Sequence, residues 1–457
     1  MSAVDRSRLP VPGAEPFFAF PTAAKRQLPN GLGLWTVRRD QLPLVSIVMV
    51  LPAGAVNDPD GRAGLAALTA DMLDEGSGDR SAIEIQEALA RMGTDLDTEV
   101  GPDAVVLSLT LLEEFVSDGL RLFADIVCRP RLTDADVTRV RDLRLNQLRQ
   151  LRDAPGANAE AVYTGLLYGS HPYGHLPIGT TASLQRISAG DIAGFHTLSY
   201  RPSRATLVAV GAIEADAFAQ EVIAAFGSWA DPASGGPVAP APAPAIQPAA
   251  SRLVIVDRPG AAQTELRVGH VGVPRKTPDF HKLVLLNAVL GGHFMSRINL
   301  NLREDKGYTY GARSAFDFRR LAGPFSVQTS VQTAATAASI REVLAEIEAI
   351  RDSRPATDDE LSLSKATLTL GYPRSFETTG QVARGLAQLV LYELPDDTFA
   401  TFGPRVRAVS SADVTAAAQR HIQPDSLTVV AVGDRSRIES DLGTLGIGSP
   451  QVVTPDL

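Results

Sequence analysis

The sequence predicts an α+β protein made of two homologous halves, and three observations support this fold class. Three anchors near the end of the first half, an Asp, a Pro and an apolar run ending in Gly, recur 222 residues later (Asp191, Pro202 and 206–211; Asp413, Pro424 and 428–433). Such long-period repetition usually marks duplicated units. The second observation is the stretch 231–250, whose six prolines favour an extended spacer. The third is that each half mixes strand and helix patterns, as α+β domains do.

The expected domains are therefore residues 1–230 and 251–457, joined by the Pro/Ala-rich linker 231–250. In the first half, the turn signal at 28–31 precedes a series of apolar, alternating runs that predict strands at 34–37, 45–50 and 106–111. Helical patterns cover 64–74, 82–92, 113–126 and 134–152. Thr133 is placed to cap the last of these helices, with acids in its first turn, and Thr357 repeats the signal in the second half.

Composition excludes several classes of protein. A formal charge of −9 and a pI of about 5.4 disfavour a nucleic-acid binder, which needs a basic surface to displace counterions. The single cysteine, Cys128, excludes an internal disulfide and is expected to be a buried, inert thiol. No apolar stretch is expected to approach the roughly 18 residues that cross a bilayer. Residues 1–22 do not read as a signal peptide, so the expected compartment is cytoplasmic, or periplasmic if a leader precedes this sequence.

The stretch 64–76, Gly-Leu-Ala-Ala-Leu-Thr-Ala-Asp-Met-Leu-Asp-Glu-Gly, is the most informative segment. It resembles the active-site helix of the pitrilysin/insulinase family of zinc peptidases, whose pattern G-L-A-H-x-x-E-H-M-L-x-x-G supplies two zinc-binding histidines and a glutamate base. A helix suits this task because residues i and i+4 lie on one face. The resemblance implies two mostly antiparallel sheets with helices packed on one face of each, forming half of a clamshell chamber.

Further motifs extend this resemblance from about residue 28 to residue 434. The first half contains an H-P-Y-G…G…F-H…Y-x-P series, and the second contains L-G-G…S-R and L-R-E-x-x-G-x-x-Y segments (171–174, 179, 195–196, 200 and 202; 290–297; 302–310). Their order and spacing strengthen the resemblance to the family. The chain is similar to the mitochondrial-processing-peptidase-like branch, which divides the enzyme into two chains of about this length.

The chemistry of the zinc site is missing from this frame. The positions of the two histidines and the base hold Ala67, Asp71 and Ala70, and alignment on Asp153-Ala154-Pro155 places Gln147 where the third ligand, a glutamate, is expected. Methyl groups cannot bind zinc, and a neutral amide is a poor ligand beside carboxylate or imidazole. The sequence therefore predicts no catalytic residue and no metal in this chain.

The histidines offer no replacement site. His171 and His175 are four residues apart, but Pro172 and Gly174 between them indicate a loop rather than a helix. His293 follows two glycines and is expected in a loop, and His196 in a helical stretch is expected to be a packing residue.

Arg303 and Tyr310 are the candidate substrate-binding residues. Lys306-Gly307 is a helix-stop signal, so Arg303 ends a helix and Tyr310 begins a strand, and the corner between them could place both side chains on one cleft wall. Guanidinium and phenol groups are donors suited to a peptide carbonyl or a developing oxyanion. The alternative is a surface arginine beside a core tyrosine. In the family that the chain resembles, this pair contacts the substrate opposite the zinc.

The resemblance implies a non-catalytic subunit that pairs with a zinc-bearing homologue, binds peptide and completes the partner's active site. Zinc is expected in the partner, and no membrane insertion is expected. A scaffold protein of the same fold, like the core subunits of the cytochrome bc complex, is the alternative from another class. A homodimer that binds peptides without cutting them is a third possibility.

Overall fold

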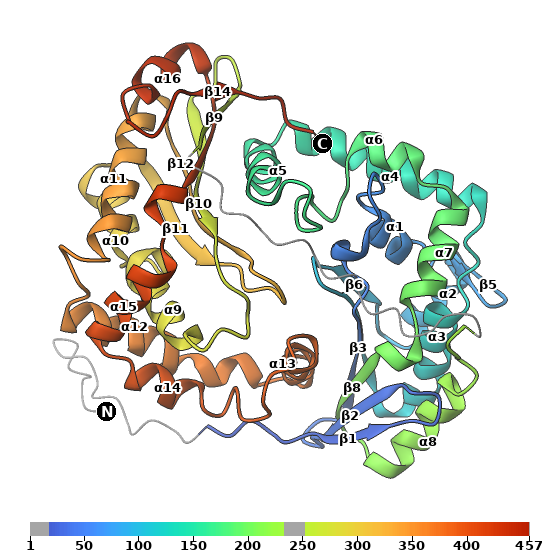
Figure 1. The fold of residues 1–457 in the computed structure, drawn as a ribbon. Coiled ribbons are helices and arrows are strands. Elements are labelled where there is room, and N and C mark those ends of the chain that lie inside the picture. The colour runs from blue at the N-terminus through green and yellow to red at the C-terminus, as the bar shows by residue number, and fades with distance from the viewer. Residues whose placement is uncertain (1–17, 233–251, 457) are drawn as a thin grey trace, which may run out of the picture.

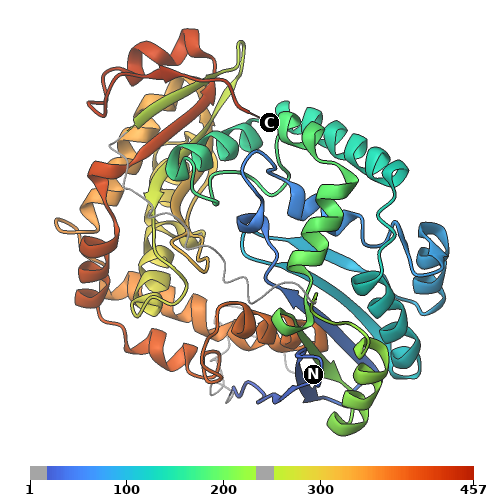
Figure 2. The same cartoon turned by 45° about the vertical axis from the view of Figure 1, so that its right-hand side comes forward.

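The computed structural model describes residues 18–232 and 252–456 and has the predicted α+β architecture (Figure 1). It contains two six-stranded sheets, one in each half of the chain, and Figure 2 shows the two halves side by side with helices on their outer sides. The proposed linker 231–250 lies almost wholly outside the described residues, so the domain boundaries stay predictions.

The first half follows the predicted strands and helices closely. Its elements are β1 (Ala24–Gln27), β2 (Gly33–Arg38), β3 (Leu44–Leu51), η1 (Ala55–Asn57), α1 (Leu65–Asp71), β4 (Gly76–Ser77), β5 (Arg80–Ser81), α2 (Ala82–Arg91), β6 (Asp97–Val100), β7 (Val105–Leu112), η2 (Glu113–Phe115), α3 (Val116–Cys128), α4 (Asp134–Arg152), α5 (Pro155–Tyr168), α6 (Thr181–Arg186), α7 (Ala189–Ser199), η3 (Pro202–Arg204), β8 (Thr206–Gly211) and α8 (Ala215–Phe226).

The second half begins at β9 (Arg252–Asp257) and β10 (Gln263–Val271). It continues with α9 (Phe280–Asn287), η4 (Ala288–Gly292), α10 (Arg297–Asn299), η5 (Leu300–Asp305), β11 (Thr309–Phe316), β12 (Pro324–Gln332), η6 (Thr333–Ala335), α11 (Thr336–Ala349), α12 (Asp358–Leu370), η7 (Tyr372–Phe376), α13 (Thr379–Leu391), α14 (Phe402–Ala408), α15 (Ser411–His421), η8 (Pro424–Ser426), β13 (Thr428–Gly433), α16 (Arg435–Leu442) and β14 (Gln451–Val452).

Strand order confirms the duplication. The first sheet runs β1-β2-β8-β3-β7-β6, and the second, read from the opposite edge, runs β14-β9-β13-β10-β12-β11. The repeated apolar runs form the equivalent strands β8 and β13, which pair in parallel with β2 and β9 and antiparallel with β3 and β10. Most of the strand pairs in both sheets are antiparallel, as expected.

Local capping explains why the repeated helices begin where they do. Ser188 and Asp191 form a capping box at the start of α7, and Ser410 and Asp413 form the same box 222 residues later at α15. Each pair satisfies backbone N–H groups that the first helical turn leaves without partners. Thr133 also caps α4, as predicted from the sequence.

The two halves exchange a helix. α5 from the first half packs on β10 and β13 of the second sheet, while α13 from the second half packs on β3 and β8 of the first, as Figure 1 shows. Tyr163 of α5 donates a 2.7 Å hydrogen bond to the carbonyl of Phe325, above Gly269. A Cβ at Gly269 would lie 2.3 Å from the Tyr163 hydroxyl, so the glycine makes room for this contact. Each sheet is therefore covered by its own helices on one face and partly by the exchanged helix on the other.

One described helical segment, Phe280–Asp305, is long and apolar enough to cross a membrane by length and composition alone. This corrects the expectation that no stretch approaches that length. Its side chains Leu283, Leu286 and Leu290 are buried in the core of the second half. Packing inside the protein therefore accounts for the apolar composition of this segment.

Candidate functional site: a degenerate zinc helix, Arg303 and Tyr310

The helix that resembles a zinc helix is α1, and its two alanines are buried. Ala67 and Ala70 are 3% and 2% exposed. The glycine that precedes α1 has a structural role, because Gly64 has φ +92° and a Cβ there would lie 2.9 Å from the Cα of Gly179. Only a glycine accepts both this backbone conformation and this close approach at low cost. α1 ends at Asp71, three residues earlier than predicted.

Asp71 is engaged by an arginine. Arg144 of α4 donates from Nε to the Asp71 carboxylate at 3.0 Å, and its Nη2 forms a second contact with the same oxygen. Burial raises the pKa of Asp71, and the Arg144 guanidinium acts in the opposite direction. Gln147, one turn further along α4, is exposed to solvent. A guanidinium therefore supplies the positive charge beside this helix, in the part of the family frame that elsewhere holds a metal.

The residues present do not fit a zinc ion. Among the residues that the structure describes, no group of three or more histidine, cysteine, aspartate or glutamate side chains could hold a metal. Asp71 alone cannot hold zinc, which takes at least three protein ligands in catalytic sites.

Asp58 belongs to this region and was missed by the sequence analysis. Its carboxylate is fully buried and accepts 2.7 Å hydrogen bonds from the backbone N–H groups of Gly64 and Ala66, so it caps α1 from outside the helix. Burial raises the pKa of Asp58 to about 7, although these hydrogen bonds act to lower it. The Nε2 atom of His175 lies 3.8 Å from this carboxylate. The cap is hard to predict because a loop of six residues separates it from the helix.

We expect the purified chain to retain no stoichiometric zinc after dialysis against trace zinc, and to hydrolyse no peptide. The reason is the substitution of all four chemical positions, Ala67, Ala70, Asp71 and Gln147. Elemental analysis by mass spectrometry, with a zinc-bearing homologue dialysed in parallel, measures this. Near-stoichiometric zinc that a chelator removes together with activity would contradict the expectation.

Three other histidines make contacts within the protein, and His196 is a packing residue, as predicted. His171 accepts a hydrogen bond from the backbone N–H of Tyr173 within a loop, and His196 in α7 contacts the carbonyl of Val127 at 2.8 Å. His293 lies 3.1 Å from the hydroxyl of Ser364. Burial raises the pKa of the Cys128 thiol to about 12, so the thiol is protonated at neutral pH, as expected for an inert cysteine.

Arg303 and Tyr310 flank the corner that the sequence predicted. Arg303 lies on the π-helical turn η5, Gly307 adopts φ +66°, and Tyr310 follows on the edge strand β11. The Arg303 guanidinium stacks over Phe294 at 4.3 Å, and its Nε lies 3.4 Å from Glu304. Tyr310 is 92% exposed, so the alternative of a core tyrosine is wrong. No contact between the two side chains is seen within the described ranges, and their shared cleft wall stays a prediction.

A cleft of about 320 Å³ lies between the halves. Its walls come from β6 and β7 of the first half and from α13 and the β11–β12 connection of the second. Asp97 and Glu99 of β6 are exposed, and β6 pairs only with β7 among the described strands. This edge therefore presents unpaired backbone groups next to the cleft.

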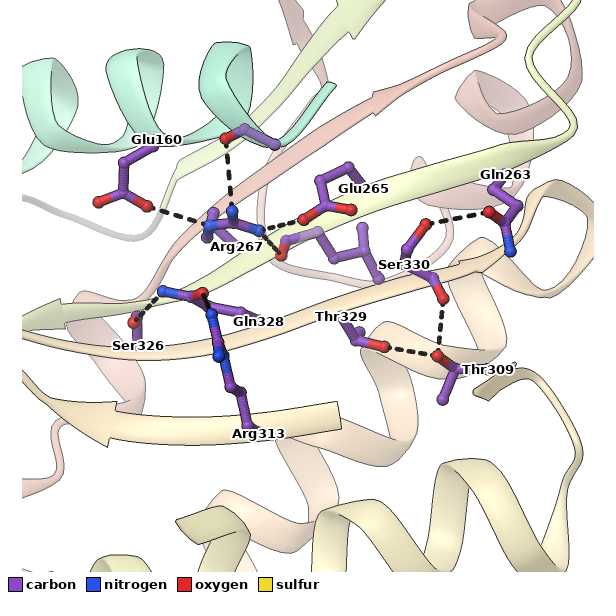
Figure 3. A network of polar contacts seen from close by, with 12 residues as sticks. Glu160, Gln263, Glu265, Arg267, Thr309, Arg313, Ser326, Gln328, Thr329 and Ser330 are labelled. Carbon is purple, nitrogen blue, oxygen red and sulfur yellow. Dashed lines mark hydrogen bonds and ion pairs between the residues drawn. The ribbon is translucent and has the colours of Figure 1, made fainter. Parts of the chain in front are cut away.

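The polar face of the second sheet is the face on which α5 packs (Figure 3). Alternation along β10, β11 and β12 turns apolar residues toward the outer helices and polar residues toward the other side. Arg267 anchors α5 here, because it contacts Glu160 of that helix at 3.1 Å. It also contacts Glu265 of its own strand at 2.6 Å. Arg313 donates to Gln328 at 3.2 Å on the part of the sheet nearer its edge. Much of this face is hydrophilic.

Comparison with known proteins agrees with these features. The insulinase (peptidase family M16) model matches residues 36–168, and the peptidase M16 inactive-domain model matches residues 186–368. The chain belongs to the M16 family. Because its zinc positions are substituted, it is a non-catalytic member of that family.

The relatives include proteins named as zinc proteases and one named as a non-peptidase homolog. The chain is 26% identical over 345 residues to an uncharacterized zinc protease of Mycobacterium bovis, covering 75% of this chain and 78% of that protein. It is 21% identical over 404 residues to a non-peptidase homolog of Helicobacter pylori, covering 87% and 90%. A crystal structure of a peptidase M16 inactive domain from Pseudomonas fluorescens superposes with a TM-score of 0.82 at 23% identity, covering 90% of this chain and 98% of that one.

Proposed function

We propose that this chain is the non-catalytic subunit of a heterodimeric zinc metallopeptidase of the mitochondrial-processing-peptidase-like branch. In this role it binds peptide and contributes Arg303 and Tyr310 to the active site of a zinc-bearing homologue. The proposal rests on two observations taken together, one on α1 and one on Tyr310. The zinc chemistry of α1 is lost, whereas Tyr310, in the family's R…Y spacing, is 92% exposed. An exposed aromatic side chain with no packing role in its own chain is suited to act on another molecule.

Peptide binding is supported by the free edge of β6. An extended peptide can add to such an edge as a further strand, where backbone hydrogen bonds give affinity with little demand on sequence. The cleft beside β6 and the polar face of the second sheet would let the polar backbone of the peptide remain hydrated or hydrogen-bonded.

Co-expression with the zinc-bearing homologue of the same genome, followed by a peptidase assay, tests the proposal. Activity of the mixed pair well above that of either chain alone is expected. If the two chains co-purify and the pair is no more active than the homologue alone, the chain is a scaffold of the same fold.

We expect the two chains to form a stable complex. Partners of this size should bury well over roughly 1,000 Å². Size-exclusion chromatography with light scattering on the mixed chains measures the mass of the complex, and each chain run alone is the control. Two species that never co-elute at micromolar concentration would count against the proposal, and a dimer of this chain alone would favour peptide binding without cleavage.

A further inference from the structure

The second half contains an aromatic pocket whose lining residues have no role in the proposed function. The pocket has a volume of about 570 Å³ and lies where α9, α13 and α14 approach one another (Figure 1). Six phenylalanines line it: Phe280, Phe316, Phe318, Phe376, Phe399 and Phe402. Binding sites for organic ligands are commonly apolar cavities of this size with a few polar groups that fix orientation.

Arg275 provides the principal polar group. Its guanidinium stacks on Phe280 at 3.5 Å, and its backbone N–H is fixed by a 2.8 Å hydrogen bond to the carbonyl of Arg319. In the part of the chain that the structure describes, no carboxylate lies within ion-pair distance of this guanidinium. Burial lowers the pKa of Arg275 to about 10, which reflects an uncompensated charge in an apolar surrounding.

Two tyrosines accompany this arginine. Tyr372 and Tyr392 line the same pocket as Arg275. Neither hydroxyl has a hydrogen bond to another described residue, so both donors are available to a ligand. A guanidinium with two phenolic donors beside it matches the acceptor pattern of a carboxylate.

The remaining charges do not neutralise the pocket. Asp317 is on its wall, but its carboxylate accepts a 2.8 Å hydrogen bond from Nε of Arg319. Arg384 also lines the pocket, and its Nη1 atom lies 4.0 Å from the carboxylate of its ion-pair partner, Asp97. The pocket therefore has an excess of positive charge.

We propose that this pocket binds a carboxylate attached to an apolar group, and that in the working protein this is the free C-terminus of a peptide ending in an apolar residue. The assignment of a peptide as the source rests on the proposed function. Asp317, Arg384, Gln388 and Tyr392 line both this pocket and the cleft beside β6, so the two spaces adjoin around α13. A peptide lying along β6 can thus place its end among the phenylalanines.

Calorimetric titration of the full chain with matched probes tests the pocket. The probes are N-acetyl-phenylalanine and its amide, and a short peptide ending in Phe prepared with a free or an amidated C-terminus. The free acid is expected to bind at least about tenfold more tightly than the amide in each pair, because an ionised hydrogen-bonded pair is lost in the amide. Arg275→Met should abolish the difference, and Tyr392→Phe should reduce it. Arg91→Met, on an exposed part of α2, should preserve it.

The outcomes separate this inference from the proposed function. Equal affinity for acid and amide, or a preference that survives Arg275→Met in a folded variant, would overturn the pocket assignment, while binding of the amidated peptide would leave peptide binding intact. Acid-selective binding of N-acetyl-phenylalanine without any peptide binding would overturn the peptide as its source and assign the pocket to a small aromatic carboxylate. Thermal unfolding of each variant verifies that the fold is retained.

Discussion

Replacing Tyr310 with phenylalanine is expected to lower kcat of the assembled peptidase by about 10²–10³-fold, or roughly 3–4 kcal/mol, by analogy with the loss of an oxyanion-hole donor. KM should change little, since an interaction made mainly in the transition state lowers kcat and kcat/KM together. Because the Tyr310 side chain is 92% exposed, loss of its hydroxyl should not change the stability of this chain. Steady-state kinetics of the purified heterodimer, with assembly checked by chromatography, measures the effect.

A matched control lies two residues away. Tyr308 is partly buried against the core of the second half, so Tyr308→Phe should leave kcat nearly unchanged. Arg303→Lys should also impair the enzyme, because it keeps the charge and loses the planar fork. Unchanged kcat in both Tyr310→Phe and Arg303→Lys would mean that the pair has no catalytic part. A loss of activity that follows a loss of assembly would instead give the pair a structural role at the subunit interface.

Replacing Arg267 with methionine is expected to destabilise the chain by about 3 kcal/mol. Arg267 is 6% exposed and pairs with Glu160 of α5 and Glu265 of its own strand (Figure 3). Removing one partner of a buried ion pair leaves the others uncompensated, which typically costs 3–5 kcal/mol. The lower end applies here because Glu160 remains about one-third exposed to water. The midpoint of thermal unfolding should fall by several degrees.

The same variant should loosen the exchanged helix. Glu160 lies on α5, so hydrogen exchange along α5 should accelerate more than exchange along the outer helix α11. Arg435→Met is the control, because Arg435 and Glu439 form a solvent-exposed ion pair, which contributes little to stability. Equal shifts in the two variants, or unchanged exchange along α5, would show that the Arg267 cluster does not hold the halves together.

Several elements were predictable because their causes lie close together in the chain. α4 has the predicted bounds, Asp134–Arg152, because the Thr133 cap and the Asp153-Ala154-Pro155 break are both local signals. The repeat of 222 residues predicted duplicated units, and the structure confirms this with equivalent strands β8 and β13. It adds the matching capping boxes of α7 and α15, which the sequence analysis did not predict. α1 was predicted too long, since nothing in the residues Met72-Leu73-Asp74 marks the point where the backbone leaves the helix.

The features of the candidate site also fall into those that residue type determines and those that distant contacts determine. Substitutions at Ala67, Ala70, Asp71 and Gln147 are statements about residue type, and the sequence alone determined that zinc ligands are missing there. The sequence could not reveal that Arg144 engages Asp71 across 73 positions, nor that Asp58 caps α1.

The sequence by itself therefore determined the fold class, the duplication and the loss of the metal ligands, because periodicity, capping and ligand chemistry depend on residue type and short spacing. Tertiary structure alone decided the exchange of α5 and α13, the exposure of Tyr310 and the aromatic pocket around Arg275. These features depend on which surfaces distant segments bury against one another. Burial sets both the environment of a charge and the availability of a side chain, and it is a property of the packed chain rather than of any local stretch.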